Sequence, residues 1–220
     1  IAINPHKREY SWFRWAKNAA TAQLLIDFGA NINRRGTSGE LPIFHSNADV
    51  LEVLIKNGAD VSLTDNYGNN ALHHSEYEAA NTKILLEAGI KPNDTNENGQ
   101  TPLILSKNMD GIQLLIDHGA DIHAYDKNGG NCLSYTRFMT EEVFNFFCSL
   151  GVDVNSKING TPSFHSWHDP KKLETALKYG LDLKAKSVDG KTALHNARLG
   201  VSKYLIEKTP SLVHVKDNQG

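Results

Sequence analysis

Long apolar segments and cysteines are both scarce in this sequence of 220 residues, and each scarcity excludes a class of protein. No apolar run approaches the roughly 18 residues of a membrane-spanning helix, so we expect no membrane insertion. Residues 1–14 are polar and aromatic without an apolar core, so no signal peptide is apparent. Cys132 and Cys148 are too few for a disulfide framework. A contact between them stays open, but we expect two free thiols in a reducing compartment, namely the cytoplasm.

An excess of positive charge is also missing. The 23 Lys and Arg against 25 Asp and Glu give a formal net charge of −2, whereas nucleic-acid-binding proteins carry a clustered basic excess. The basic stretches that do occur, Lys171 with Lys172 and residues 181–191, lack the neighbouring aromatic side chains that base stacking needs. We therefore expect no nucleic-acid partner.

Sequence signatures of catalysis are absent as well. The chain contains no G-x-S-x-G nucleophile elbow, no phosphate-binding G-x-x-x-x-G-K and no H-E-x-x-H pair. Among the 10 histidines, His165 and His168 are spaced to share a helical face, but further metal ligands are lacking and Asp169 suits a helix cap better. The sequence predicts no catalytic, metal-binding or cofactor-binding site within the chain; an enzyme domain in flanking sequence stays open.

What the sequence does contain is one segment that recurs about every thirty residues. It reads LLIDFGANI at residues 24–32, VLIKNGADV at 53–61 and LLIDHGADI at 114–122. The anchoring glycines, spaced by 29 to 32 residues, are Gly29, Gly58, Gly89, Gly119, Gly151 and Gly180. A fixed period in this range indicates stacked supersecondary units rather than one globular core.

Each unit has the same order of turn, first helix, second helix and glycine. A polar turn ending in glycine, such as residues 65–68, supplies the positive φ of a tight turn. A tetrapeptide then begins the first helix, with Thr or Asn as N-cap and often Pro next, as in Thr101-Pro102 and Thr161-Pro162. The second helix has helically spaced apolar residues, and the recurring glycine ends it in a left-handed conformation. Its expected N-caps are Asp49, Asp110, Thr140 and Asp169, the last followed by Pro170.

These turns and tetrapeptides resemble the ankyrin repeat. The family pattern D-x-x-G-x-T-P-L-H, followed by G-A-D-V-N, is matched by QTPL at 100–103, GKTALH at 190–195 and GADI at 119–122. Seven tetrapeptides span essentially the whole chain and end at Phe13, Phe44, His73, Ile104, Ser134, Phe164 and His195. The resemblance implies an all-α solenoid of about seven helix-turn-helix repeats with projecting, hairpin-like turns. It also implies that His73 and His195 hydrogen-bond between neighbouring turns.

We expect a single domain over residues 1–220. The predicted repeats are approximately 5–33, 34–63, 64–94, 95–124, 125–155, 156–185 and 186–214, and 215–220 opens a further repeat. The tetrapeptides recur every 29 to 31 residues, whereas ankyrin repeats run about 33, so we infer a shortened first helix or a tighter turn between helices. The first unit, with Trp12 and Trp15, is expected to cap the core, and the incomplete last repeat suggests a piece of a longer protein.

The resemblance further implies that turn tips and the exposed face of the first helices bind partners. The candidate partner-binding residues are Arg35, Tyr67, Glu97, Tyr125, Lys127, Trp167 and Lys186. Tyr67 and Tyr125, at equivalent edges of their turns, are the expected anchors, because Tyr and Arg often dominate interface energetics. Trp167 precedes a helix cap and is either an exposed contact or a filler between repeats. Any single tip residue could instead be solvated and contact nothing.

The sequence therefore predicts a non-catalytic, monomeric scaffold that binds a protein partner on its concave face and turn tips. Two alternatives stay open. One is a targeting module of a larger enzyme or of a secreted effector acting in a host-cell cytoplasm, because the Asn- and Lys-rich, degenerate repeats are similar to ankyrin proteins of intracellular bacteria or protists. The other is a spacer or homo-oligomer element without a defined ligand.

Overall fold

The computed structural model describes residues 13, 16–37, 39–75, 78–135 and 139–219. It divides into two compact units, Ile1–Ala120 and Asp121–Gly220, each of which is a stack of short repeats. Trp12 and Trp15, on which the expected N-terminal cap is based, lie outside the described residues. The repeat boundaries and the single-domain organisation stay predictions.

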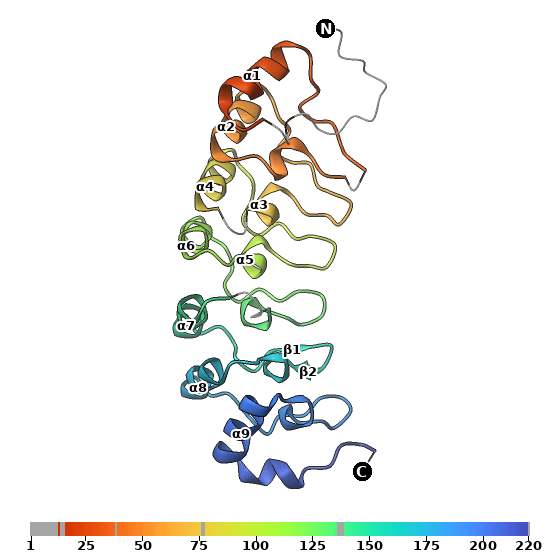
Figure 1. The fold of residues 1–220 in the computed structure, drawn as a ribbon, viewed down its shortest axis with the longest axis vertical. Coiled ribbons are helices and arrows are strands. Elements are labelled where there is room, and N and C mark those ends of the chain that lie inside the picture. The colour runs from red at the N-terminus through yellow and green to blue at the C-terminus, as the bar shows by residue number, and fades with distance from the viewer. Residues whose placement is uncertain (1–12, 14–15, 38, 76–77, 136–138, 220) are drawn as a thin grey trace. The chain divides into compact units, whose positions relative to one another are not determined.

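The first unit alternates long helices with single helical turns. The long helices are α1 (Ala19–Asp27), α2 (Ala48–Lys56), α4 (Ala79–Glu87) and α6 (Met109–Asp117). The single turns are the 3₁₀ helix η2 (Pro42–Phe44), α3 (Ala71–His74) and α5 (Pro102–Leu105). Within this unit the long helices line one side and the connecting loops project from the other (Figure 1).

The second unit repeats this alternation. Its long helices are α7 (Glu141–Ser149), α8 (Pro170–Lys178) and α9 (Leu199–Lys208). Its short 3₁₀ helices are η3 (Cys132–Ser134), η5 (Ser163–Ser166), η6 (Ala193–Asn196) and η7 (Pro210–His214). Apart from η7, which has five residues and follows the last long helix, these short helices have three or four residues, so the short repeat period reflects a first helix reduced to one turn.

Two of the four predicted N-caps are confirmed. The Thr140 side chain accepts a hydrogen bond from the Val143 amide at 3.3 Å and begins α7. Asp169 accepts from the Lys171 amide at 3.0 Å, and Pro170 occupies the first helical position of α8. A side-chain oxygen at this position satisfies an amide that the helix itself cannot pair.

The other two predicted caps are wrong. Asp49 and Asp110 lie inside the first turns of α2 and α6. The capping oxygens belong to Asn47 and Asn108, which accept hydrogen bonds at 3.1 and 2.9 Å. Asn and Asp are both good capping residues. Asn47 and Asn108 act as the caps because their backbones are extended, with ψ of 169° and 126°. The negative charges of Asp49 and Asp110 still stabilise the helices, because they lie near the positive end of the helix dipole.

One turn of the second unit is a regular hairpin. Strands β1 (Lys157–Ile158) and β2 (Thr161–Pro162) pair antiparallel, with Ile158 opposite Thr161. The two connecting residues, Asn159 and Gly160, have φ of 50° and 77°. Two left-handed residues with the sequence Asn-Gly are the typical link of a two-residue hairpin.

This hairpin corrects the predicted start of the next helix. Thr161 and Pro162 belong to the strand, so Thr161 does not cap a helix, and η5 begins at Ser163. The reason is that Thr161 and Pro162, which would begin a helix, pair with Ile158 and Lys157 to close the hairpin.

The core of each unit lies between the long and short helices. Fully buried side chains include Leu51, Leu54, Leu72, Leu85, Leu103 and Ile112 in the first unit and Phe144, Phe147, Phe164 and Trp167 in the second. The predicted left-handed ends of the long helices are confirmed, with φ between 78° and 92° at Gly29, Gly58, Gly89, Gly119, Gly151 and Gly180. This conformation turns the chain away from the helix toward the next loop.

Asparagine side chains join successive repeats just after these glycines. The Asn155 amide donates to the Gly180 carbonyl oxygen at 3.0 Å, and its oxygen accepts from the Asp182 amide at 2.9 Å. Asn33 makes both equivalent bonds in the first unit, and Asn93 donates to the corresponding carbonyl. Such bonds to backbone groups fix the stacking of one repeat on the next.

Ser62 interrupts this pattern between Asn33 and Asn93. Its side chain is too short to reach the next repeat, and its hydroxyl donates to Asp60 Oδ1 at 2.6 Å instead. A cavity of about 380 Å³ lies beside it, bordered also by Gly89 and Lys91. These two residues follow α4 as Gly180 and Asp182 follow α8.

We expect Ser62→Asn to raise the free energy of unfolding by about 1 kcal/mol, because the longer amide can bond Gly89 O and Lys91 N. Urea denaturation followed by circular dichroism measures the change. Ser62→Ala is the matched control, since it removes the hydroxyl without adding an amide, and should give no gain. Equal midpoints for the two variants would contradict the assignment.

Candidate functional site

The loops that project from each unit are held in shape by their own polar residues. We call each loop between the glycine after a long helix and the next short helix a finger, and the exposed residues of the fingers the finger surface. In the finger of residues 60–70, Asp65 Oδ1 accepts from the Tyr67 and Asn69 amides at 2.8 and 2.9 Å. The Asp65 amide in turn donates to Asn69 O at 2.9 Å. The tip is thus fixed before any partner arrives.

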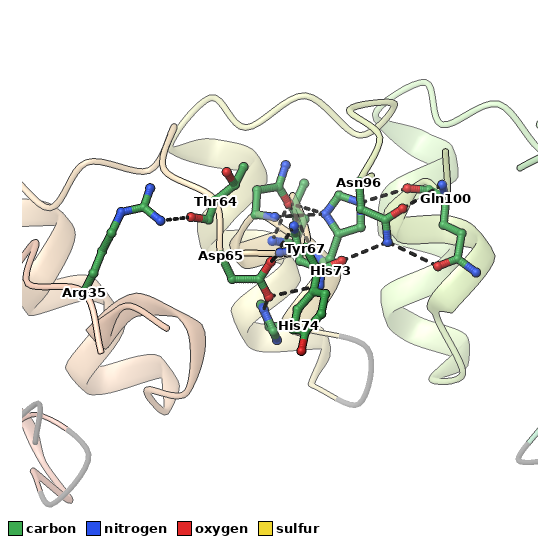
Figure 2. Close-up of polar contacts among 11 residues, drawn as sticks. Arg35, Thr64, Asp65, Tyr67, His73, His74, Asn96 and Gln100 are labelled. Atoms are coloured by element: carbon green, nitrogen blue, oxygen red, sulfur yellow. Dashed lines mark hydrogen bonds and ion pairs between the residues drawn. The ribbon is translucent and has the colours of Figure 1, made fainter. Parts of the chain in front are cut away.

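The Asp65 carboxylate also anchors the first helix behind the finger. Its Oδ2 lies 3.1 Å from His74 Nε2 and accepts from Asn69 Nδ2 at 3.0 Å. Partial burial raises the pKa of Asp65, but these hydrogen bonds outweigh it and hold the pKa below its ordinary value. Asp65 therefore keeps its charge and its acceptor role. Figure 2 shows the carboxylate between the finger and α3.

Neighbouring fingers are joined tip to tip through their backbones. The Glu97 amide donates to the Tyr67 carbonyl oxygen at 2.9 Å. Equivalent bonds in the second unit join Asn159 N to Asn128 O (2.8 Å) and Asn218 N to Asp189 O (2.9 Å). Because the bonds are between backbone atoms, they hold the tips in register whatever side chains the tips carry.

Tyr67 and Arg35 are both exposed, but they differ in what they do. Tyr67 is 63% exposed at the tip of its finger. Its backbone amide donates a hydrogen bond to Asp65 and its carbonyl oxygen accepts one from Glu97. The Arg35 guanidinium donates to the Thr64 carbonyl oxygen of the following finger at 2.5 Å (Figure 2). Tyr67 is therefore available to a partner, whereas one guanidinium nitrogen of Arg35 already forms a hydrogen bond between two fingers.

Tyr125 is not equivalent to Tyr67, which corrects the sequence-based alignment. Tyr67 is the third residue of its turn, whereas Tyr125 stands before the turn that Asp126 opens. Its hydroxyl donates to Asp153 Oδ2 of the next repeat at 3.1 Å. Partial burial and the nearby Asp153 carboxylate raise the pKa of Tyr125. Tyr125 is 49% exposed, so part of it is open to a partner while its hydroxyl joins two repeats.

Trp167 does not belong to the finger surface. Its side chain is 2% exposed and meets the Phe144 ring edge-on at 5.1 Å between centroids. Of the two alternatives left open by the sequence, the filler between repeats is therefore the one found. The residue lies between η5 and α8, where the chain folds inward over α7.

The remaining candidates are exposed on fingers. Glu97 and Lys127 are the second residues of their turns, and Lys186 precedes its turn. Val188, also at a turn tip, is 68% exposed. Sequence reasoning missed the role of Tyr135, whose hydroxyl donates to Asp126 Oδ2. Tyr135 follows Asp126 by nine residues, as His74 follows Asp65, so this spacing is the signal that could have found both anchors.

Three of the described histidines, one in each of three short helices, form hydrogen bonds within or between repeats. His73 Nε2 lies 3.0 Å from Gln100 O in the next finger, which confirms the predicted bond between neighbouring turns. Burial lowers the pKa of His73 and keeps it neutral. His165 makes a similar contact, with Nε2 3.1 Å from Ala185 O. His195 instead accepts from the Thr192 amide within its own repeat, at 3.1 Å.

Across the residues that the structure describes, no three His, Cys, Asp or Glu side chains come close enough together to hold a metal ion. None of the helices in this described part is long and apolar enough to cross a membrane.

Comparisons with known proteins agree with this geometry. Residues 38–126 match the family model of ankyrin repeats, in three copies. The chain is 29% identical over 206 residues to an ankyrin repeat protein of fowlpox virus, covering 86% of this chain and 37% of that protein. It is 28% identical over 182 residues to the phosphocholine transferase AnkX of Legionella pneumophila, covering 70% of this chain and 19% of that enzyme.

Among solved structures, the human ASB11 ankyrin repeat domain matches with a TM-score of 0.74 at 21% identity, covering 90% of this chain and 98% of that one. The match at this identity concerns the fold. Against the two sequence relatives, the chain spans only 37% and 19% of their lengths.

Proposed function

Since this chain is an ankyrin-repeat protein with the predicted all-α repeat fold, we propose that it binds a protein partner through its finger surface and has no catalytic role of its own. The observation that carries the proposal is a contrast within the fingers. Their backbones are fixed by hydrogen bonds within the turn and, in three pairs, by a bond to the next finger, while side chains such as Tyr67 and Lys186 are exposed.

Such a surface suits recognition because little conformational entropy remains to be lost from its backbone. Binding costs free energy for each loop and side chain that becomes ordered, and a preordered loop avoids part of this. Tyr67 combines a fixed backbone with a large exposed ring, and Tyr is a residue type that often dominates binding energy. We propose Tyr67 as the anchor, with Arg35, Glu97, Tyr125, Lys127 and Lys186 as further contacts.

The cysteines support a non-catalytic role. Burial raises the pKa of Cys132 to about 12 and that of Cys148 to about 11, so neither thiol is an activated nucleophile. Both are free thiols, which supports our inference of a reducing location such as the cytoplasm. We also propose a monomer, which light scattering of the purified chain tests; a dimer would favour the homo-oligomer alternative.

The proposal is tested by photo-cross-linking. A photoreactive phenylalanine analogue is placed at Tyr67, and in a matched control at Lys83, which is exposed on the long helix α4. In a lysate we expect a specific adduct from position 67 and none from position 83. For the captured partner, Tyr67→Ala should weaken binding about tenfold or more, which is about 1.4 kcal/mol. Adducts from position 83 alone, or unchanged affinity, would contradict the proposal.

A second candidate function is a targeting module within a larger protein that carries an activity elsewhere. The similarity to AnkX, of which this chain matches 19%, favours it. Sequencing the complete open reading frame decides the matter. A catalytic or secretion segment joined to these repeats supports the module, and its absence leaves the scaffold alone.

A further inference from the structure

One junction between repeats of the first unit has an open cavity where equivalent junctions have a hydrogen-bonded asparagine. The cavity, of about 380 Å³, lies between the fingers that follow α2 and α4. Ser62, Gly89 and Lys91 border it, and all three are exposed, so the cavity opens to solvent. It also borders Gly68, the residue directly after the exposed Tyr67. The cavity is therefore part of the finger surface.

The equivalent junctions show which group this place holds elsewhere in the fold. Asn33 Nδ2 donates to Gly58 O at 3.4 Å, and Asn33 Oδ1 accepts from the Asp60 amide at 2.8 Å. Asn155 makes the same two bonds to the residues that follow α8, at 3.0 and 2.9 Å. In both junctions one primary carboxamide pairs with a carbonyl oxygen and with the amide two residues later.

Ser62 occupies the same position as these asparagines. Each of the three is the fourth residue after the glycine that ends a long helix. Each of their backbone amides donates to the Asn or Asp side chain two residues earlier, at 2.8 to 2.9 Å. The local backbone is therefore alike, and the side chain makes the difference. The Ser62 hydroxyl donates to Asp60 Oδ1 within its own finger and does not cross to the next repeat.

Two backbone groups are consequently left open at the cavity. Within the described residues, the carbonyl oxygen of Gly89 accepts no hydrogen bond and the amide of Lys91 donates none. They follow α4 in the same order as the bonded carbonyl and amide follow α2 and α8. The cavity is thus bordered by one acceptor and one donor whose counterparts bind a carboxamide.

This pair of groups defines the chemistry of an occupant. A primary carboxamide has an N–H and an oxygen on the same side, so it can donate to the carbonyl while it accepts from the amide. A carboxylate can only accept, and an ammonium group can only donate. In a trans peptide bond the N–H and the C=O point in opposite directions, so a main-chain amide cannot make both bonds. The pair therefore favours a primary carboxamide over these other groups.

We propose that the cavity binds the carboxamide of a glutamine side chain presented by a protein partner. The share of one water molecule in the liquid is about 30 Å³, so a volume of about 380 Å³ has room for the whole side chain. Glutamine is one methylene longer than asparagine and reaches in from a backbone outside the cavity. The proposal rests on the proposed function and adds a specific contact beside Tyr67.

The test is a titration of the whole chain followed by nitrogen–proton correlation NMR. The probe is acetyl-Gly-Gln-Gly-N-methylamide, whose only primary carboxamide is the glutamine side chain. We expect the Lys91 amide resonance to shift and to saturate at millimolar peptide, because two hydrogen bonds give weak affinity. The Asp60 and Asp182 amides already bond an asparagine and should not shift. No shift at Lys91 would show that water alone occupies the cavity and would overturn the proposal.

Two further peptides test the carboxamide itself. Glutamate replaces glutamine in one and methionine in the other, so each side chain has a similar length but no amide. Both should bind at least about fivefold more weakly than the glutamine peptide. Equal or tighter binding of the glutamate peptide would indicate attraction to the Lys91 ammonium group, and equal binding of the methionine peptide would indicate apolar contact. Either result contradicts the proposal.

Two substitutions at Ser62 test the place of binding. Ser62→Asn brings a carboxamide of the chain itself into the cavity and should abolish the shift at Lys91. Ser62→Ala is the matched control, because it removes the hydroxyl but leaves the cavity open, and should keep the affinity within about twofold of wild type. Binding that persists in Ser62→Asn, or that disappears in Ser62→Ala, would overturn the proposal.

The outcomes also separate this proposal from the proposed function. For a partner captured through Tyr67, Ser62→Asn should weaken binding about fivefold or more, and Ser62→Ala by less than about twofold. If Tyr67 captures a partner while the glutamine peptide shifts nothing, the proposed function stands and the carboxamide site fails. If the peptide shifts Lys91 while cross-linking at Tyr67 and Lys83 captures nothing specific, the carboxamide site stands and the choice of Tyr67 as anchor fails.

Discussion

Replacing Trp167 with alanine is expected to lower the free energy of unfolding by about 3–5 kcal/mol. The indole is 2% exposed and lies 5.1 Å from the Phe144 ring and 6.4 Å from the Phe164 ring, centroid to centroid. Its removal takes away the largest buried side chain of the second unit and leaves a cavity that the rigid helices around it fill only in part. Urea denaturation monitored by circular dichroism measures the loss.

Tyr67→Ala provides the contrast for this experiment. It also removes a large aromatic side chain, but one that is 63% exposed, so stability should change by no more than about 0.5 kcal/mol. Trp167→Phe adds a second check, because the indole nitrogen has no hydrogen-bond partner within the described residues and only packing is altered. A Trp167→Ala protein as stable as wild type would restore the exposed alternative.

Gly129→Ala is expected to destabilise the chain by about 2–5 kcal/mol. Gly129 has φ of 84°, where an L-residue is strained by roughly 1–2 kcal/mol. An added Cβ would also lie 2.6 Å from the Lys157 carbonyl oxygen of the next finger, and overpacking of this kind costs about 1–3 kcal/mol. The same denaturation experiment measures both effects together.

Gly151→Ala isolates the contribution of the neighbouring finger. Gly151 has a similar φ of 78°, but its added Cβ would meet no atom within 4 Å. We expect a loss of about 1 kcal/mol from the backbone strain alone. The difference between the two losses therefore measures the steric cost of the close contact between Gly129 and the next finger. Equal losses would show that this contact has no such cost.

The fold was predictable because its signals are local. The glycine that ends each long helix, the apolar spacing before it and the caps at Thr140 and Asp169 all act within a few residues, and each copy supports the others. The shortened first helix was also predictable, because too few residues lie between the tetrapeptide and the glycine that ends the second helix to form more than one turn of first helix. The choice of Asn47 over Asp49 was not, because both residue types cap helices equally well and only the path of the chain decides.

The candidate site was less predictable because its geometry depends on neighbouring repeats. Whether Trp167 faces solvent depends on Phe144, which lies 23 residues earlier, in α7. The hydroxyl of Tyr125 is engaged only because Asp153 of the following repeat accepts its hydrogen bond. The contact of Arg35 was also not predictable, because its partner is the backbone carbonyl oxygen of Thr64, which any residue type at that position would supply. No pattern within one repeat contains these contacts.

The tip-to-tip bonds have an evolutionary consequence. The amides of Glu97, Asn159 and Asn218 make them, and every amino acid except proline supplies the same N–H. Mutation at the finger tips can therefore exchange one binding preference for another while the scaffold remains intact. A laboratory library diversified at positions 97 and 218 without proline would sample new specificities on an unchanged frame, whereas position 159, with its positive φ, favours Asn, Asp or Gly.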